Sequence, residues 1–523
     1  MITALPAPAP SDSAWTWPRV ADLRLADPAG ADPGRAARAV LWPARISPAA
    51  PGRCPWPIQR RRAGSRVRTN PLVVRPRRWL PYVFSYGMGA ESTAGLVEIT
   101  TNPCRRPPEI APDFHNLIVI VAQTGDEWSV TGELVERFVL PLLRERRIRF
   151  VEVARNGPRE SDGITVLQDT REPWRLHLDG VYRLSDEHHD SGTMPQASGH
   201  HTCAQKSKGV PLDTWRAQNI GDGLFYHMIG YNVLEQSRMA KDSGYAMGGR
   251  RMSRYLIAGW KMTRDDCVDY LTEKIEKLYG IVGLVWPKSC CRECPYISRV
   301  GWEEQLTRFK ERPAEAVRHI VDEYCCLALN PRSGLYGVGK SMGSRLAADG
   351  AREVLDLAQA RMAVMPWAVY RVRRRMTGPA KGTRSVRRVA VGPATKMREL
   401  LHGMARVTDV ALSVNEVIPG APKRGGDLDT HERLWVHRRA EGVYPTAEEF
   451  YVVAPAQPVD KEPANFDDTW EELGLDRQVE QRLATVPMAA DALTRRRASR
   501  ARRKGTATTA ASSSRAGAVP LAG

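Results

Sequence analysis

The sequence lacks any long apolar run. No stretch of its 523 residues approaches the roughly 18 consecutive apolar residues that are needed to cross a bilayer. It also lacks, at its start, the short basic segment and apolar run that mark a secretory signal. These two absences argue against a membrane partner and predict a cytoplasmic protein.

The cysteine content does not have the pattern of a disulfide framework. The chain contains nine cysteines, an odd number in a long sequence, and several of them lie close together. Disulfide frameworks belong mainly to small secreted domains. We therefore expect reduced thiols, some of which bind a metal.

The chain is basic, and its charge is unevenly distributed. Lys and Arg number 77 against 59 Asp and Glu, a net charge of +18. Residues 1–78 are rich in Pro, Ala and Arg without helical or strand periodicity, which predicts a disordered arm. We expect a folded domain over 79–345, a basic extension with a small α/β unit over 346–470, and a helix followed by a disordered basic tail over 471–523. The basic ends could contact nucleic acid.

The segment after the arm alternates strands with helices. Tyr82-Val83-Phe84 is short and β-favouring, and Leu117 to Ala122 is continuously apolar, as in a parallel strand buried on both faces. A helical pattern runs from about Thr131 to Arg144, and a third strand from Ile148 to Val153. This alternation predicts an α/β fold with a doubly wound, mainly parallel sheet.

The pattern continues less clearly towards the C-terminus. We expect strands at Tyr226 to Ile229 and at Tyr255 to Ala258, and a helix that starts after Thr263 and runs to about Leu278. A further helix is expected around Arg345 to Met365, followed by a strongly basic stretch, Arg371 to Arg388. Cys325 and Cys326 lie in a helical pattern and are expected in a core.

The loop from Ser85 to Thr93 is the first candidate site. A Ser- and Gly-containing loop between a strand and a helix lets main-chain N–H groups approach a polyphosphate, and the helix dipole favours the anion. Gly87 and Gly89 are expected to adopt conformations that a side chain would forbid, while the hydroxyls act as donors. The loop lacks the Gly-Lys-Ser/Thr ending of a Walker motif, and an ordinary βα turn is an equally good interpretation.

A set of cysteines is the second candidate site. Cys290, Cys291 and Cys294 form a Cys-x-x-Cys knuckle with one additional thiol, and Cys203 lies far upstream. Four thiolates could hold Zn²⁺ or a [4Fe–4S] cluster. The neighbouring lysines, Lys206 and Lys208, are expected to lower the pKa of Cys203 and to attract phosphate or sulfate. The alternative is that Cys203 is a buried thiol and that the knuckle binds nothing.

Three charged residues follow predicted strands, where open α/β sheets collect ligands. They are Glu127, Glu235 and Arg238. Each could contact a nucleotide, but a solvated pair is the default interpretation for Glu235 and Arg238.

The order of these motifs resembles the adenine-nucleotide alpha-hydrolase (PP-loop) superfamily, and within it the phosphoadenylyl-sulfate (PAPS) reductase-like proteins of bacteria and phages. The matching segments, between about Tyr82 and Lys340, are Ser85 to Thr93, Ala122 to Glu127, Cys203 to Lys208, Ile229 to Arg238, Ile257 to Asp266 and Pro287 to Pro295. Several motifs in the same order are more specific than the glycine loop alone.

The resemblance implies a flavodoxin- or Rossmann-like sheet that binds ATP, PAPS or APS with Mg²⁺. It implies phosphate binding by Ser85, Gly87, Gly89, Ser92 and Thr93, with Glu127, Glu235 and Arg238 also at the nucleotide. It assigns catalysis to Cys203, Lys206 and Lys208, and a metal or cluster to Cys203, Cys290, Cys291 and Cys294. The reaction implied is adenylylation with pyrophosphate release, in sulfur transfer or nucleic-acid modification, with a sulfur donor as partner.

The sequence departs from that family in several positions. Tyr86 and Met88 depart from the usual Ser-Gly-Gly pattern, Glu91 replaces an Asp, and Gln123 replaces an acid that could assist Mg²⁺. No cysteine follows Cys326, whereas the true reductases place a nucleophilic cysteine near the C-terminus. Two alternatives remain open: a reductase that uses Cys203 and a thioredoxin-like partner, and a nucleic-acid-associated protein that binds nucleotide without turnover.

Overall fold

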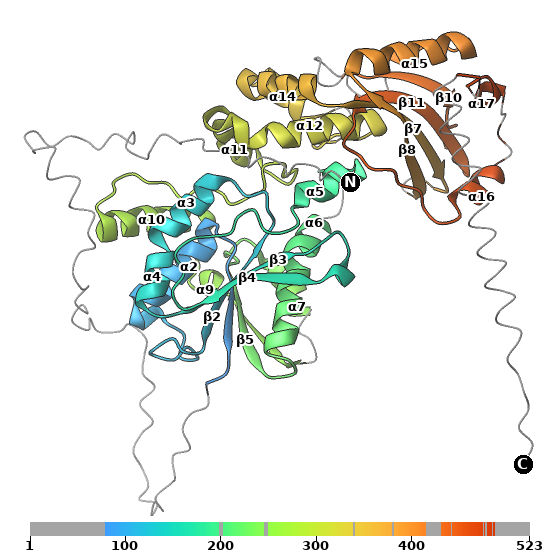
Figure 1. Cartoon of the computed structure of the whole chain (residues 1–523). Coiled ribbons are helices and arrows are strands. Elements are labelled where there is room, and N and C mark those ends of the chain that lie inside the picture. Colours follow the sequence, from blue (N-terminus) through green and yellow to red (C-terminus); the bar gives the residue numbers. More distant parts are fainter. Residues whose placement is uncertain are drawn as a thin grey trace, which may run out of the picture. The chain divides into compact units, whose positions relative to one another are not determined.

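The computed structural model describes residues 79–197, 202–244, 249–337, 340–378, 381–414, 430–440, 442–473, 475, 478–483 and 485–486 (Figure 1). All of them belong to the unit Thr69–Gly523. The arm predicted over 1–78 and the tail beyond 486 lie outside these residues. No helix within the described ranges is long and apolar enough to cross a membrane.

The N-terminal half is built on a six-stranded, mostly parallel sheet with the order β4-β3-β2-β1-β5-β6 (Figure 1). Its strands are β1 Tyr82–Ser85, β2 Leu117–Gln123, β3 Arg149–Arg155, β4 Ile164–Thr170, β5 Phe225–Ile229 and β6 Arg251–Arg254. The edge strand β4 is antiparallel to β3, and the other neighbours are parallel. All seven residues of β2 are buried, as expected for a strand covered on both faces. The chain is therefore α/β, compatible with a Rossmann-like fold.

Helices cover both faces of this sheet. On one face the core joins the sheet to α2 Ala90–Thr101, α3 Ser129–Phe138, α4 Leu140–Glu145 and α10 Arg264–Tyr279. On the other face α7 Val210–Asn219 packs against β2, β3 and β4, with Trp215 fully buried. The remaining helical segments of this half are η2 Pro103–Arg105, η3 Glu160–Asp162, α5 Leu184–Ser191, α6 Thr202–Ala204, the π-helical turn η4 Gln205–Gly209, α8 Gln236–Gly244 and α9 Leu256–Gly259.

Two of the expected elements in this half were wrong. The helix expected over Thr131 to Arg144 is split into α3 and α4 at Val139, because Pro141 has no N–H to continue the helical hydrogen bonds. The strand expected at Tyr255 to Ala258 is the short helix α9, and β6 ends before it at Arg254. A run of four apolar residues fits a strand or a helix turn equally well. The helix expected after Thr263 is confirmed as α10, with the Thr263–Asp266 capping box.

Four helices follow the parallel sheet. They are α11 Arg299–Glu311, α12 Pro313–Leu329, α13 Met342–Ala348 and α14 Arg352–Val364. The single helix expected around Arg345 to Met365 is therefore two helices, separated by a turn in which Gly350 has a φ of 76°. Cys325 and Cys326, in α12, are each 1% exposed in the core, as expected.

A second, antiparallel sheet of five strands has the order β8-β7-β11-β10-β9. Its elements, with the helices that follow, are β7 Trp367–Met376, β8 Gly382–Gly392, α15 Ala394–Thr408, β9 Ser413–Val414, β10 Glu432–His437, β11 Thr446–Pro455, α16 Phe466–Glu471 and α17 Gln478–Leu483. Helix α15 packs on one face, and the end of α12 packs on the other. The basic stretch Arg371 to Arg388 forms most of the β7–β8 hairpin.

Candidate functional site

The candidate phosphate loop lies at the point in the parallel sheet where the order of the strands reverses. Strand β1 is central, and the chain proceeds from it to β2 and β3 on one side before it returns to β5 on the other. In open α/β sheets, ligands bind outside the carboxyl ends of the strands at such a switch point. The loop that follows β1 runs from Ser85 to Gly89, directly into α2.

The main-chain N–H groups of this loop have no acceptor. From Gly87 through Ser92, no N–H donates a hydrogen bond to any group in the described part of the chain; Tyr86 N bonds Ile120 O, and Thr93 N bonds Gly89 O. The N-cap of α2, Gly89, provides no side-chain cap. A row of free N–H groups at a helix N-terminus is an arrangement that binds anions.

The glycines of the loop do not have the conformations that the sequence predicted. Gly89 is extended, with φ −79° and ψ 170°, and the left-handed residue is Met88, with φ 59°. A Cβ at Gly87 would come no closer than 3.8 Å to Ser92, and one at Gly89 no closer than 3.6 Å to Glu91. The prediction that these two glycines are needed for their backbone conformation was therefore wrong.

A close approach occurs at Gly230 instead, just after β5. A Cβ there would lie 2.9 Å from the Cα and N atoms of Ser92. Main-chain atoms cannot yield as the end of a flexible side chain can. Gly230 therefore allows the first turn of α2 to lie against the end of β5.

The hydroxyls of the loop bond to the protein. Ser92 Oγ donates to Gly89 O at 3.2 Å, and Thr93 Oγ1, fully buried, lies 3.1 Å from the hydroxyl of Tyr86. Ser85 Oγ lies 2.7 Å from Nε2 of His227. The groups of the loop that remain open are thus mainly the main-chain donors.

A segment from far along the chain holds the carbonyls of the loop. Trp286 Nε1 donates to Met88 O at 3.0 Å, and Ser289 Oγ donates to Gly87 O at 2.8 Å. The N–H and C=O of one peptide group point in opposite directions. The N–H groups of Met88 and Gly89 therefore face away from this segment.

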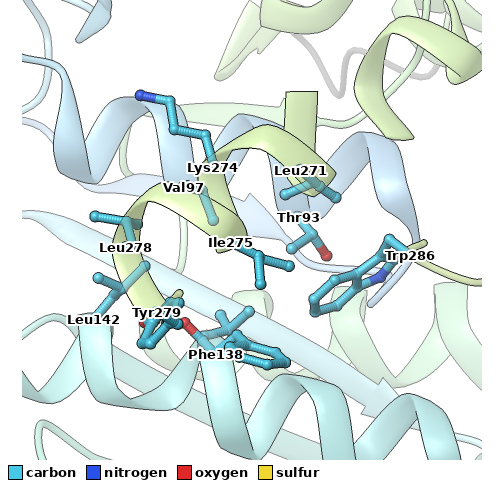
Figure 2. A pocket seen from close by; sticks show the side chains of 11 residues that line it. Thr93, Val97, Phe138, Leu142, Leu271, Lys274, Ile275, Leu278, Tyr279 and Trp286 are labelled. Atoms are coloured by element: carbon cyan, nitrogen blue, oxygen red, sulfur yellow. The ribbon is translucent and has the colours of Figure 1, made fainter. Parts of the chain in front are cut away.

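The core behind the loop is closed to ligands. Between α2, α10 and the α3–α4 pair there is only a gap of about 10 Å³, lined by Thr93, Ile275, Trp286 and other mainly apolar side chains (Figure 2). Such a volume accommodates about one water molecule. The gap is therefore too small for a phosphate group.

The lysines of the Cys203–Lys208 segment take different partners. Lys208 Nζ lies 3.0 Å from Glu127 Oε1, a carboxylate that is 1% exposed and also accepts from Ser289. Burial alone would lower the pKa of Lys208, but the Glu127 carboxylate together with the thiols of Cys291 and Cys294 raises it. Lys206 instead pairs with Glu187 at 2.8 Å. The structure thus links Lys208, and not Lys206, to the phosphate loop through Glu127 and Ser289.

The predicted cysteines lie beside this network. Cys291 forms a β-bridge with Glu127, and its sulfur lies 3.5 Å from Thr124 Oγ1. Burial raises the pKa of Cys290 to about 12 and the pKa of Cys291 well above its usual value. The expectation that Lys206 and Lys208 lower the pKa of Cys203 was wrong, because burial outweighs Lys208 and raises it.

The thiols of Cys290 and Cys291 have different neighbours. The sulfur of Cys290 is 3.4 Å from Gln305 Oε1 and 3.6 Å from Arg308 Nη1. Over the described ranges, no group of three or more His, Cys, Asp or Glu side chains is placed to hold a metal ion. In this arrangement the residues do not fit Zn²⁺ or a [4Fe–4S] cluster. The ligand set Cys203, Cys290, Cys291 and Cys294 stays a prediction.

Glu235 and Arg238 form an ion pair with each other. Arg238 is 62% exposed and lies over the ring of Tyr231. Glu235 also accepts from the main-chain N of Asn232, whose side chain donates to Glu91 in the first turn of α2. The pair is therefore solvated, as the alternative interpretation expected, and a nucleotide role stays a prediction.

The sequence did not indicate a buried charged cluster beneath the cysteine loop. Glu293, between Cys291 and Cys294, lies 2.6 Å from His188 Nδ1 and 3.2 Å from His319 Nδ1. Burial would raise the pKa of Glu293, but the two histidines lower it below its usual value. These residues come from three distant segments, so no local spacing could have indicated them. The cluster anchors the cysteine loop to α5 and α12.

A larger hollow, of about 450 Å³, is formed by the antiparallel sheet, α15 and α12. Tyr324, Trp367, Arg398 and His431 are among its lining residues. None of the residues predicted from the sequence lines it, so it is separate from the candidate site.

Comparisons with protein-family models, with curated proteins and with solved structures gave no match to this chain.

Proposed function

We propose that the chain binds ATP or a related adenylyl nucleotide at the loop after β1 and adenylylates an acceptor with release of pyrophosphate. The observation that carries this proposal is the row of acceptor-free N–H groups from Gly87 to Ser92 at the switch point of the sheet. The order of motifs that resembles the adenine-nucleotide alpha-hydrolases supports the choice of nucleotide.

The chemistry expected at such a site is electrostatic. Main-chain donors and the N-terminus of α2 would hold the phosphates, and they require no reorganisation as charge shifts towards the departing pyrophosphate. Lys208 supplies a cation next to this loop, while Glu127 and Ser289 fix its position. Mg²⁺ would accompany the phosphates, and no step of the proposed reaction depends on a protein-bound metal.

The reductase alternative is less well supported. It requires a thiolate at Cys203, but burial raises the pKa of that thiol. The nucleic-acid alternative rests on the basic ends, which lie outside the described residues. The basic stretch Arg371 to Arg388 adds little to it, because its arginines have partners within the protein. Both alternatives would also place a nucleotide at the acceptor-free N–H groups, so pyrophosphate release is the measurement that distinguishes adenylylation from them.

The experiment targets the main chain of the loop through Gly230. We expect Gly230→Val to displace Ser92 and the first turn of α2, and so to weaken ATP binding at least tenfold by calorimetry and to reduce pyrophosphate release. The matched control is Gly259→Ala, since a Cβ at Gly259 would meet nothing within 4 Å. Circular dichroism would establish that both variants fold.

Equal ATP affinity in the Gly230→Val variant and the wild type, or no ATP binding by the wild type, would overturn the proposal. A double variant, Ser85→Ala with Ser92→Ala, measures how much the two hydroxyl groups contribute to ATP affinity. We expect it to bind ATP more weakly than the wild type, because Ser85 lies at the start of the loop.

A further inference from the structure

The contact between Ser85 and His227 places a buried imidazole at the start of the phosphate loop. Ser85 ends β1, and its Oγ is 2.7 Å from His227 Nε2 on the neighbouring strand β5. His227 is 5% exposed, and its other ring nitrogen, Nδ1, has no hydrogen-bond partner among the described residues. The ring therefore makes one hydrogen bond, and that bond goes to the loop.

The strand register places cations on the side of His227 opposite Ser85. Ser85 pairs with Ile229, two residues beyond His227, whereas Arg251 pairs with Phe225, two residues before it. Residues two apart along a strand share a face. Arg216, from α7, lies over the same Phe225, with its guanidinium 5.6 Å from the ring centre. Both arginines are 7% exposed.

These arginines keep unused donors in the buried region. Arg216 pairs with Asp213, and Arg251 with Asp242, yet Arg216 Nη1 and Arg251 Nε have no hydrogen-bond partner in the part of the chain that the structure describes. Two guanidinium groups favour a lone pair on the imidazole nitrogen that faces away from Ser85. Burial, and then Arg216 and Arg251, lowers the pKa of His227 well below its usual value.

This environment argues against a serine nucleophile activated by His227. A general base at His227 would have to take the Ser85 proton and become an imidazolium ion. That cation would be buried beside two guanidinium groups, and no carboxylate bonds to the ring to stabilise it. The serine–histidine contact is therefore unsuited to covalent catalysis.

We propose that His227 is a positioning residue: it stays neutral, donates its Nε2 proton to Ser85 Oγ, and thereby leaves the Ser85 hydroxyl proton free for a phosphate oxygen. A serine oxygen that already accepts a hydrogen bond cannot use that bond to donate, so its own proton is directed elsewhere. This inference rests on the proposed nucleotide function. It requires that the ligand atom at Ser85 be a hydrogen-bond acceptor, as an unprotonated phosphate oxygen is.

The first test is the tautomer of His227 in the full chain without nucleotide. Long-range ¹H–¹⁵N spectra of ¹⁵N-histidine-labelled protein distinguish Nε2–H, Nδ1–H and imidazolium forms, and the signal absent from His227→Gln assigns the ring. We expect the Nε2–H form. An Nδ1–H form or an imidazolium ion would overturn the proposal, whatever the protein binds.

The second test is ATP affinity in a double-mutant cycle with Ser85→Ala. We expect His227→Leu to weaken binding about tenfold in the wild type, from loss of one hydrogen bond to a charged group, and not at all in Ser85→Ala. His227→Gln keeps an N–H donor where Nε2 lies, so it should bind within about threefold of wild type. Equal losses from His227→Leu in both backgrounds, or a loss in His227→Gln as large as in His227→Leu, would overturn the proposal.

The two tests separate this inference from the function on which it rests. If the wild type binds no ATP, the proposed function fails and the phosphate contact of Ser85 fails with it, while the tautomer is still decided. If the wild type binds ATP and Gly230→Val does not, but the cycle shows no coupling, the function stands and the role of His227 is overturned.

Discussion

The two sheets of this protein differ in whether their most distinctive polar groups have partners within the protein. In the antiparallel sheet, β7 carries four arginines, and each has a carboxylate partner: Arg371 lies 2.5 Å from Glu449, Arg373 2.8 Å from Asp467, Arg374 2.8 Å from Glu448 and Arg375 3.8 Å from Glu472. In the parallel sheet, the loop after β1 is nearly free of charge, yet its N–H groups from Gly87 to Ser92 have no acceptor among the described residues. Unsatisfied donors indicate a binding site better than charge density does, because buried or half-buried polar groups are otherwise paired.

The same comparison changes the meaning of the net charge of +18. In the sequence, the stretch Arg371 to Arg388 is strongly basic and contributes to this charge. In the structure, Arg387 and Arg388 pair with Glu462 and Asp460, and Arg384 donates to the carbonyls of Ser191 and Gly192. Burial lowers the pKa of Arg384 to about 10. These cations serve the folded structure, so they contribute little to a surface for nucleic acid.

The largest effect should come from breaking a matched charge in the antiparallel sheet. Arg371→Met leaves the Glu449 carboxylate, which is 0% exposed, without its partner. Removal of one member of a buried ion pair costs about 3–5 kcal/mol. We expect urea unfolding to show a loss of that size, with ATP affinity unchanged.

Two further variants test the origin of that loss. The double variant Arg371→Met with Glu449→Leu removes both charges and should recover much of the stability. Arg388→Met removes a cation that is 37% exposed, so the change should stay below about 1 kcal/mol. A loss in Arg388→Met equal to that in Arg371→Met would contradict the comparison.

A smaller effect is expected from His227 in the parallel sheet, and it depends on pH. Burial, Arg216 and Arg251 lower the pKa of the folded His227 well below 6.5, while the unfolded chain titrates near about 6.5. As the pH falls below that value, the unfolded chain binds a proton that the folded protein cannot. Stability should therefore fall by up to about 1.4 kcal/mol per pH unit.

The measurement is urea unfolding of wild type and His227→Gln between about pH 7.5 and 5. The carboxylates of Asp213 and Asp242, which pair with the two arginines, are common to both proteins. The difference between the two slopes thus isolates His227. A wild-type slope no steeper than that of His227→Gln would show that the imidazole is protonated in the folded state.

The smallest effect concerns DNA. The arginines of the β7–β8 hairpin form ion pairs within the protein. The double variant Arg387→Gln with Arg388→Gln should therefore leave the salt dependence of DNA affinity unchanged. Removal of a cation that binds a DNA phosphate would reduce the slope of log affinity against log salt by about one. Fluorescence anisotropy at several salt concentrations measures that slope, and a reduction of that size would return the hairpin to the candidate interfaces.

Local patterns in the sequence were enough to predict the elements that carry the site. The apolar run of β2, the loop before α2 and the Thr263–Asp266 capping box are each encoded within a few residues. The short apolar runs of β1, β2 and β3 predicted the central parallel strands in the same way. The same short range explains the error at α9, where four apolar residues did not define their own conformation.

The parts of the site that were missed depend on residues distant in sequence. His227 meets Ser85 only through the register of β1 with β5, and Glu293 meets His188 and His319 from separate helices. The pKa of Cys203 was predicted in the wrong direction because burial cannot be read from neighbouring lysines. The sequence shows which side chains are present, but their contacts and pKa values depend on burial in the tertiary structure.

The two hydrogen bonds that residues 286–289 donate to the candidate phosphate loop also have a consequence for biosynthesis. Gly87 and Ser289 are 202 positions apart, and Met88 and Trp286 are 198 apart. During translation the loop emerges long before either donor exists, and closing so long a chain segment carries an entropic cost that only the surrounding fold can offset. The candidate phosphate loop can therefore form both of these hydrogen bonds only after the ribosome has passed residue 289.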